Sequence, residues 1–204
     1  MKTKLVYIIR HGETDYNRLG IVQGSGIDMP LNELGMKQAQ KFYDYYKGIK
    51  FNKIYTSALI RTQQSVLPFI EAGQAYQATE ALNEISWGVF EGKPQSEQER
   101  AQYWSVVNAW KEGNYHAKIE GGESAFELQM RQKSFIQYLE GRNEDCILIS
   151  MHGRAMKSFL CTLLDLPLSD MEKFEHSNLC LYLLNFEEDT VKVLKHADIA
   201  HLQA

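Results

Sequence analysis

The stretch that decides the fold is Leu5-Val6-Tyr7-Ile8-Ile9, followed at once by Arg10-His11-Gly12-Glu13-Thr14. Its apolar residues follow one another without alternation, which is typical of a strand buried on both faces. Such a strand lies in the middle of a sheet that helices cover on either side. The sequence therefore predicts a central strand over 5–9, with charged residues directly beyond its carboxyl end.

Helix and strand patterns alternate after this strand. Asn32 is a good N-cap and Gly48 a good stop, so a helix is predicted between them. Its inward face is expected to carry Met36, Ala39, Tyr43 and Tyr46. A short strand is expected over 53–56, and a helix from Ala58 that Pro68 kinks or ends.

The alternation is interrupted in the middle of the chain. Residues 82–92 contain Gly88 and Gly92 and are expected to form a loop. Residues 96–110 have a polar composition that favours a helix. We interpret residues 92–122 as a helical insertion, or lid, on the main sheet.

The alternation then resumes. A helix is predicted over 124–139, a second central strand over 146–150 and a helix over 153–164. The candidate inward residues of the first of these helices are Phe126, Met130 and Phe135. Near the C-terminus, residues 179–186 and 191–195 flank Glu187-Glu188-Asp189 and predict a hairpin.

Strands that alternate with helices are typical of an α/β domain. The chain has 204 residues, and at roughly 150 residues per domain one domain over 1–204 is expected. We therefore predict a three-layer α/β/α fold with a mostly parallel central sheet and a helical insertion.

The composition limits the partners. Twenty-two Lys and Arg residues against 26 Asp and Glu residues give a net charge of −4, so no global attraction to nucleic acid or an anionic membrane is expected. The cysteines form no CxxC pair and are expected to be reduced thiols, as in a cytoplasmic protein. No apolar run has the length of a signal-peptide core or a membrane span.

Ligands of α/β domains usually bind beyond the carboxyl ends of the strands. There the sequence holds Arg10-His11, then Arg61-Thr62, then His152-Gly153. Guanidinium groups and the free N–H groups of helix N-termini match phosphate oxygens. A histidine that surrounding cations keep neutral can attack phosphorus through a ring nitrogen, and no metal or other cofactor is then required.

These motifs, in this order, resemble the histidine phosphatase superfamily, in its phosphoglycerate mutase-like branch. The resemblance covers nearly the whole chain and includes residues 19–31, 82–92 and 121–124. It implies that His11 is the nucleophile, forming a phosphohistidine, and that Glu84 is the general acid and base. The groups implied to bind the transferring phosphoryl group are Arg10, Arg61 and His152. The positions that match the lining of the phosphate pocket are Asn17, Gln23, Gly24 and Gly153.

Other polar residues are interpreted as structural. Glu13 is closer in sequence to His11 than Glu84 is, but we expect it to orient the loop after the first strand. The histidines outside the motifs lack metal-ligand spacing and are expected to be structural or exposed; they are His116, His176, His196 and His201. The alternative for His116, which lies in the insertion, is a role as a lid residue.

The substrate class follows from the insertion. The glycolytic mutases of this family hold the substrate carboxylate with a paired arginine there, whereas Arg100 is the single arginine of residues 91–122. The resemblance therefore favours a metal-independent phosphomonoesterase that acts on a small phosphorylated metabolite. The alternatives are a cofactor-dependent phosphoglycerate mutase, an α-ribazole phosphatase-like enzyme and a non-enzymatic module that senses a phospho-ligand. The aromatic residues of the insertion either cover a ring of the substrate or pack the insertion onto the domain; they are Tyr103, Trp104, Trp110 and Tyr115. The oligomeric state stays open.

Overall fold

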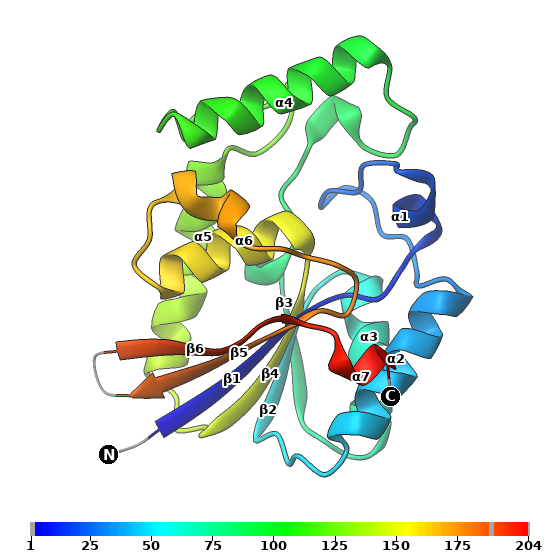
Figure 1. Cartoon of the computed structure of the whole chain (residues 1–204), viewed down its shortest axis with the longest axis vertical. Coiled ribbons are helices and arrows are strands. Elements are labelled where there is room, and N and C mark those ends of the chain that lie inside the picture. The colour runs from blue at the N-terminus through cyan, green and yellow to red at the C-terminus, as the bar shows by residue number, and fades with distance from the viewer. Residues whose placement is uncertain (1–2, 188–189, 204) are drawn as a thin grey trace.

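The computed structural model describes residues 3–187 and 190–203, and its strands form a six-stranded sheet in the order β3-β2-β4-β1-β5-β6 (Figure 1). The strands are β1 (Thr3–Arg10), β2 (Lys53–Ser57), β3 (Tyr76–Thr79), β4 (Cys146–Met151), β5 (Leu181–Glu187) and β6 (Thr190–Asp198). The first four run parallel to one another, and β5 and β6 pair antiparallel to their neighbours. The sheet is therefore mostly parallel, as predicted.

The apolar run at the start of the chain is confirmed as a central strand. Ile8 of β1 pairs with Ile149 of β4 on one side and with Tyr182 of β5 on the other. Ile8 and Ile9 are both fully buried, because each points into a different layer of the core. The carboxyl ends of β1, β2 and β4 consequently lie at one edge of the sheet.

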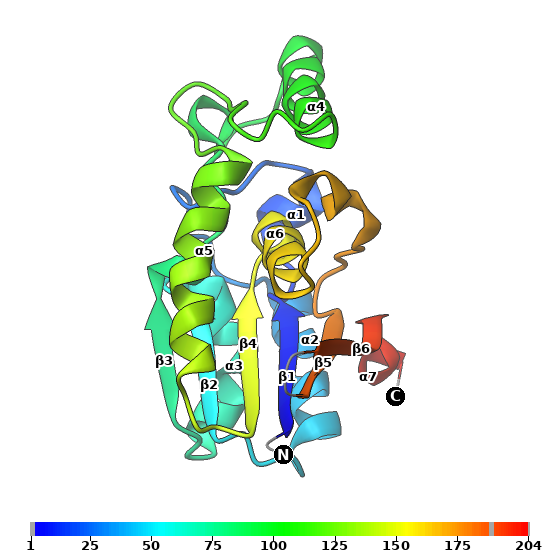
Figure 2. The same cartoon turned by 90° about the vertical axis from the view of Figure 1, so that its left-hand side faces the viewer.

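Helices cover both faces of the sheet (Figure 2). On one side lie α2 (Glu33–Tyr46), α3 (Ile60–Glu71) and α7 (Ala200–Gln203), and on the other side α5 (Ala125–Glu140) and α6 (Gly153–Leu163). Phe42 and Phe69 form one core with Ile9, whereas Leu128 and Phe159 form the other with Ile8. The predicted three-layer α/β/α architecture is confirmed.

The helix starts follow from their caps. The side chains of Asn32 and Ser124 accept hydrogen bonds from backbone N–H groups in the first turns of α2 and α5. Ser96 does the same for α4 (Glu97–Lys111), where Glu99 completes a capping box. A short helix that was not predicted, α1 (Asp15–Leu19), begins at a capping box on Thr14.

The predicted inward face of α2 is wrong by one residue at its start. Met36 is exposed, and the buried face carries Gly35, Ala39, Phe42 and Tyr46. The backbone of Glu13 fixes this rotation, because a Cβ atom on Gly35 would lie only 2.1 Å from the Glu13 carbonyl oxygen. The helix must turn its glycine toward that loop, and Met36 is thereby carried outward.

The face of α5 was also predicted incorrectly. Phe126 and Met130 are exposed, and of the three candidates only Phe135 is buried. The sheet-facing residues are instead Ala125, Leu128, Gln132, Phe135, Ile136 and Leu139. Phe126 packs one side of its ring against His116 of the insertion, with 4.6 Å between the ring centroids, and the rest of the ring stays exposed.

Two further predictions need correction. Of the two effects expected of Pro68, a kink or an end, the end is ruled out, because α3 continues to Glu71. Val66 and Phe69 are completely buried and hold the last turn in place despite the lost hydrogen bond. The strand β3 was missed, because it is an edge strand whose side chains are largely exposed and so carries no apolar pattern. The turn of the predicted C-terminal hairpin includes residues 188 and 189, which lie outside the described residues, while β5 and β6 pair as expected.

Residues 82–92 are mostly irregular, as expected, with two short 3-10 turns, η1 (Glu80–Leu82) and η2 (Gly88–Phe90). A third, η3 (Leu168–Lys173), follows α6. The helix α4 extends across the molecule beyond the carboxyl ends of the strands (Figure 1). Trp110 of this helix is buried and Tyr103 packs on Trp87 with 4.6 Å between ring centroids, whereas Trp104 is 53% exposed. Most of the aromatic residues of the insertion therefore serve packing. Within residues 3–187 and 190–203, no helix combines the length and apolar character needed to cross a bilayer.

Candidate active site

The loops that follow β1, β2 and β4 bring two histidines and two arginines together. The rings of His11 and His152 lie 5.2 Å apart between centroids. Arg61, on the first turn of α3, donates from Nε to Nδ1 of His152 at 3.1 Å. Arg10 contributes to lowering the pKa of both histidines through its charge. The residues predicted from the three strand ends are therefore brought together.

His11 is held in one tautomer. Its Nδ1 lies 2.7 Å from the backbone oxygen of Gly12, and since a carbonyl oxygen can only accept, Nδ1 carries the proton. The lone pair of the neutral ring is then on Nε2. Burial, followed by the positive charges of Arg10 and Arg61, lowers the pKa of His11 well below its ordinary value. The ring is 4% exposed and is neutral around pH 7.

His152 has the opposite tautomer. Its Nδ1 accepts from Arg61, so the proton of the neutral ring is on Nε2, which donates to Ser57 Oγ at 2.8 Å. Burial, then the charges of Arg61 and His11, lowers the pKa of His152 well below its usual range. Both ring nitrogens are thus bonded to protein groups. In this arrangement His152 holds the side chain of Arg61, whereas His11 has a lone pair on Nε2.

Arg61 ties the site to the loop that precedes α2. Its side chain is completely buried, and it donates to the backbone oxygens of Ile27 at 2.6 Å and Gly24 at 3.2 Å. Burial is the main cause that lowers the pKa of Arg61 to about 10, so the group remains a cation at neutral pH. A buried cation without a carboxylate bonded to it is an unusual cost in a folded protein, and an anionic ligand would offset it.

Arg10 is held by a histidine that the sequence did not reveal as part of the site. Its Nη1 donates to the backbone oxygen of His176 at 2.6 Å and approaches His176 Nδ1 at 3.3 Å. Burial, then the charges of Arg10 and Lys157, lowers the pKa of His176 to about 3, so its ring is neutral and can accept from the guanidinium. The Nε atom of Arg10 is buried and has no partner among the described residues, which leaves a donor for a ligand.

His176 also packs over the start of α6. A Cβ atom on Gly153 would lie 2.9 Å from His176 Nδ1, so glycine is required there by this close approach. Asn178, two residues after His176, donates to the backbone oxygen of His11 at 3.0 Å and to Asn17 Oδ1 at 3.2 Å. Neither His176 nor Asn178 follows a parallel strand, and no sequence pattern marks them.

Three of the residues predicted to line the phosphate pocket contact Thr14 of the loop after His11, or Arg61. Asn17 Oδ1 accepts from the backbone N–H of Thr14 at 3.3 Å, and Gln23 donates to Thr14 Oγ1 at 2.7 Å. Gly24 supplies the carbonyl oxygen that Arg61 binds. Glu13 has the structural contact expected of it, because its carboxylate accepts from Asn32 Nδ2 at 2.8 Å.

Glu84 lies against the N-terminus of α6. Its carboxylate accepts from the backbone N–H groups of Ala155 at 2.7 Å, Ile85 at 2.9 Å and Arg154 at 3.0 Å. The side chain is 7% exposed. Its negative charge opposes the lowering of the pKa of both Arg10 and Arg61, which places it in the same electrostatic neighbourhood. Across residues 3–187 and 190–203, no group of three or more His, Cys, Asp and Glu side chains is arranged to hold a metal ion.

Comparison with known proteins agrees with this geometry. The family described as histidine phosphatase superfamily (branch 1) matches residues 6–199. The chain is 35% identical over 137 residues to the fructose-2,6-bisphosphatase TIGAR of Bos taurus, a match that covers 65% of this chain and 49% of the relative. The chain therefore spans about half the length of that relative. It is 32% identical over 191 residues to a probable phosphoglycerate mutase GpmB of Yersinia pestis (strain Pestoides F), covering 90% of this chain and 85% of the relative.

Solved structures share the fold of this chain. The α-ribazole phosphatase from Shigella flexneri superimposes with a TM-score of 0.85 at 25% identity and covers 95% of this chain and 96% of that one. The putative α-ribazole-5'-P phosphatase from Escherichia coli strain K-12 shares the fold with a TM-score of 0.85 at 24% identity, covering 96% of both chains. The paired histidines, the two arginines beside them and a family match over residues 6–199 lead to one conclusion: this chain belongs to the histidine phosphatase superfamily, branch 1.

Proposed function

We propose that this chain is a phosphomonoesterase that hydrolyses a small phosphate ester through a phosphohistidine on Nε2 of His11, without a metal ion. The observation that carries the proposal is the tautomer of His11. Its Nδ1 proton is held by the Gly12 carbonyl, and its pKa is lowered, so the nucleophilic nitrogen is unprotonated at neutral pH. The guanidinium groups of Arg10 and Arg61 supply positive charge where a metal would otherwise be needed.

The proposed reaction has two steps. In the first, the Nε2 lone pair of His11 forms a bond to phosphorus as the ester P–O bond breaks, and protonated Glu84 gives its proton to the leaving oxygen. In the second, the Glu84 carboxylate takes a proton from water as the water oxygen attacks phosphorus, and the P–N bond breaks to release phosphate. Arg10 and Arg61 stabilise the charge on the phosphoryl oxygens in both transition states. The backbone N–H groups of Ile85, Arg154 and Ala155 hold the Glu84 carboxyl group in place for both steps.

The proposed substrate is a small phosphorylated metabolite, because Arg61 is completely buried, Arg10 is partly buried and the chain as a whole is acidic. Neither a nucleic acid nor a membrane fits this charge distribution. Residues 92–122 are proposed as an insertion that covers the crevice within a single domain. Free thiols at Cys146, Cys161 and Cys180 favour a reducing compartment such as the cytoplasm.

Trapping tests the proposal. The protein is mixed briefly with p-nitrophenyl phosphate, quenched and digested, and mass spectrometry should find a phosphorylated peptide that contains His11. The His11→Ala variant should give no such peptide and should lose roughly 10⁴-fold or more in kcat, as other enzymes do without their nucleophile. His116→Ala is the matched control, since this histidine is exposed and packs on Phe126, and it should keep full activity. Phosphatase activity that survives His11→Ala would refute the assignment of the nucleophile.

A phosphoglycerate mutase is the second candidate, favoured by the match to the probable mutase over 90% of this chain. It requires cations that hold the substrate carboxylate, and the single arginine of residues 91–122, Arg100, is exposed. Assays with 3-phosphoglycerate and 2,3-bisphosphoglycerate separate the two activities: we expect phosphate release, and efficient isomerisation without it would overturn the hydrolase. Absence of phosphohistidine with every ester tried, α-ribazole phosphate included, would point to a sensing module instead.

A further inference from the structure

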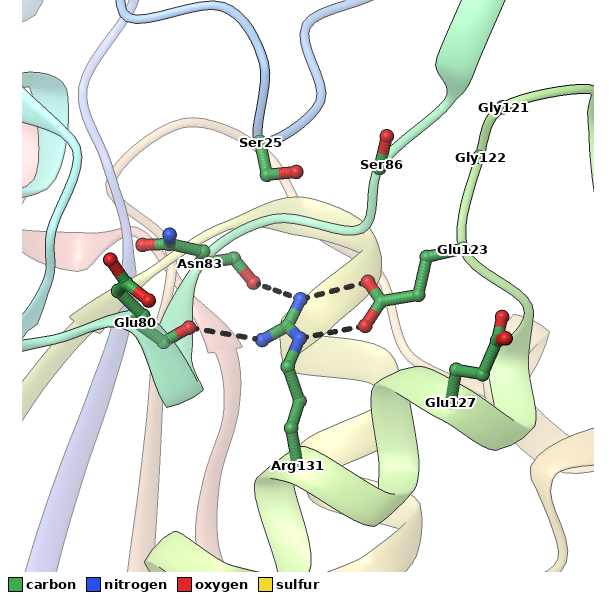
Figure 3. Close-up of a pocket in the computed structure, with 9 residues that line it drawn as sticks. All are labelled: Ser25, Glu80, Asn83, Ser86, Gly121, Gly122, Glu123, Glu127 and Arg131. Atoms are coloured by element: carbon green, nitrogen blue, oxygen red, sulfur yellow. Dashed lines mark hydrogen bonds and ion pairs between the residues drawn. The ribbon is translucent and has the colours of Figure 1, made fainter.

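One guanidinium outside the crevice is bonded to the segment that carries Glu84. Arg131 of α5 makes a bidentate ion pair with Glu123, with Nε and Nη2 at 2.8 and 3.0 Å from the two carboxylate oxygens (Figure 3). Its Nη2 also lies 2.8 Å from the backbone oxygen of Asn83 and 3.0 Å from that of Glu84, and its Nη1 lies 2.8 Å from that of Ala81. We name this set, Arg131 with Glu123, the clamp.

The clamp also reaches the end of the insertion. Glu123 follows Gly121-Gly122, and its backbone N–H donates to the Ser86 oxygen at 2.8 Å. Together these bonds hold both ends of segment 83–86, with side-chain donors at one end and a backbone donor at the other. Arg131, Glu123, Asn83 and Ser86 are among the residues that line an open pocket of about 490 Å³ (Figure 3). The glycine-rich motif at 121–124, which the chemistry of the crevice does not use, thus has a contact role.

The segment needs such support. It lies between the turns η1 and η2 and belongs to no helix or strand, so no ladder of backbone hydrogen bonds fixes it. The side chains of Arg131 and Glu123 are 25% and 18% exposed, and a partly shielded bidentate pair is stronger than an ordinary surface ion pair. The clamp can therefore determine where the Glu84 backbone sits.

We infer that Arg131 is a positioning residue for Glu84: it fixes the backbone from which the proton donor reaches the leaving oxygen, and it links that backbone to the end of the insertion. The inference rests on the proposed function. Proton donation requires hydrogen-bond contact between Glu84 and the leaving oxygen, and a misplacement of about 1 Å can cost roughly 100-fold in rate. Loss of the clamp should consequently impair proton donation more than phosphate binding.

Two substrates separate these effects. An alkyl phosphate needs a protonated leaving group, whereas p-nitrophenyl phosphate leaves as a stabilised phenolate and needs little help. The measured quantity is kcat/KM for each, because it reports the first transfer to His11, together with inhibition by inorganic phosphate. For Arg131→Met we expect the alkyl-to-aryl ratio to fall roughly 10- to 100-fold, with inhibition by phosphate changed less than about threefold. Glu123→Gln keeps the shape and the carbonyl contacts of Arg131 and should lower the ratio less.

The controls distinguish the possible failures. Lys118→Met removes the neighbouring exposed ion pair with Glu127, which makes no bond to segment 83–86, and should leave the ratio unchanged. In a Glu84→Gln background, Arg131→Met should change the ratio no further, since the proton donor is already gone. An unchanged alkyl-to-aryl ratio in folded Arg131→Met and Glu123→Gln, or an equal loss of kcat/KM on both substrates, would overturn the role of Arg131. It would leave the proposed function untouched. An unchanged ratio in Glu84→Gln would remove Glu84 as the acid and the proposed mechanism with it.

Discussion

Two neighbouring histidines, His11 and His152, have opposite tautomers because their hydrogen-bond partners differ. A carbonyl oxygen beside His11 forces the proton onto Nδ1, and a guanidinium N–H beside His152 forces it onto Nε2. In the sequence, His11 and His152 look alike, because each is a histidine that follows a strand. The sequence therefore cannot assign their tautomers. The local acceptor or donor therefore decides which ring can act as a nucleophile.

Arg61→Lys tests how far the site depends on guanidinium geometry. The arginine donates in three directions, to His152, Ile27 and Gly24, and a lysine cannot reproduce that planar fork. We expect kcat/KM for p-nitrophenyl phosphate to fall on the order of 10³-fold, although the charge is kept. The matched control is Arg18→Lys, at an exposed pair with Asp15, which should keep its activity. A loss below about tenfold in Arg61→Lys would show that charge alone suffices.

Sequence patterns identified the residues at strand ends and missed those from later loops. His11, Arg61 and His152 follow parallel strands, whose carboxyl ends must meet at one edge, so their convergence was predictable. His176 and Asn178 enter from the loop before the antiparallel strand β5, and their approach to Arg10 and His11 depends on where η3 directs the chain. Arg131 likewise reaches Glu84 from the side of α5, and no spacing in the sequence encodes that contact.

At the scale of elements, the spacing of apolar residues does not fix how a helix is rotated about its own axis. Close contacts between the helix backbone and distant segments fix that rotation. The caps Asn32, Ser96 and Ser124 fixed the helix starts within a residue, since capping is a local interaction. The rotation of α2 and α5 about their axes was missed, because it depends on contacts with distant segments. In α2 that contact is between Gly35 and the loop after β1.

Gly88→Ala and Gly113→Ala form a matched pair that measures how much a close contact between a glycine and another backbone segment contributes to stability. Both glycines have positive φ, +54° and +92°, so alanine is strained at either position by about 1–2 kcal/mol. At Gly113 a Cβ atom would meet nothing within 4 Å, whereas at Gly88 it would lie 2.0 Å from the Glu120 carbonyl oxygen. We expect urea unfolding to show a loss of about 1 kcal/mol for Gly113→Ala and roughly 3 kcal/mol or more for Gly88→Ala. Equal losses would mean that the loop at 120–122 moves away without cost.

On the scale of the whole molecule, the acidic net charge and the cationic crevice are compatible because they occupy different places. Arg10 is partly buried and Arg61 completely buried beside neutral histidines, and desolvation is the chief cause that lowers the pKa of each arginine. Packing this much positive charge without a bound anion destabilises the folded chain. Two apolar cores, one on each face of the sheet, supply the stability that offsets it.

This arrangement makes the stability of the fold dependent on pH through its neutral histidines. The pKa of His176 is about 3 in the folded chain, against an ordinary value near 6.5 when unfolded. Below about pH 6.5, His176 binds a proton in the unfolded chain but not in the folded chain. The free energy of unfolding therefore falls as the pH falls. This single group should cost about 2 kcal/mol between pH 7.5 and pH 5.0. Urea unfolding at both pH values, in buffers free of phosphate, should therefore show a smaller loss for His176→Asn than for the wild type, by about that amount. Equal losses in the two proteins would show that His176 is not held neutral beside Arg10.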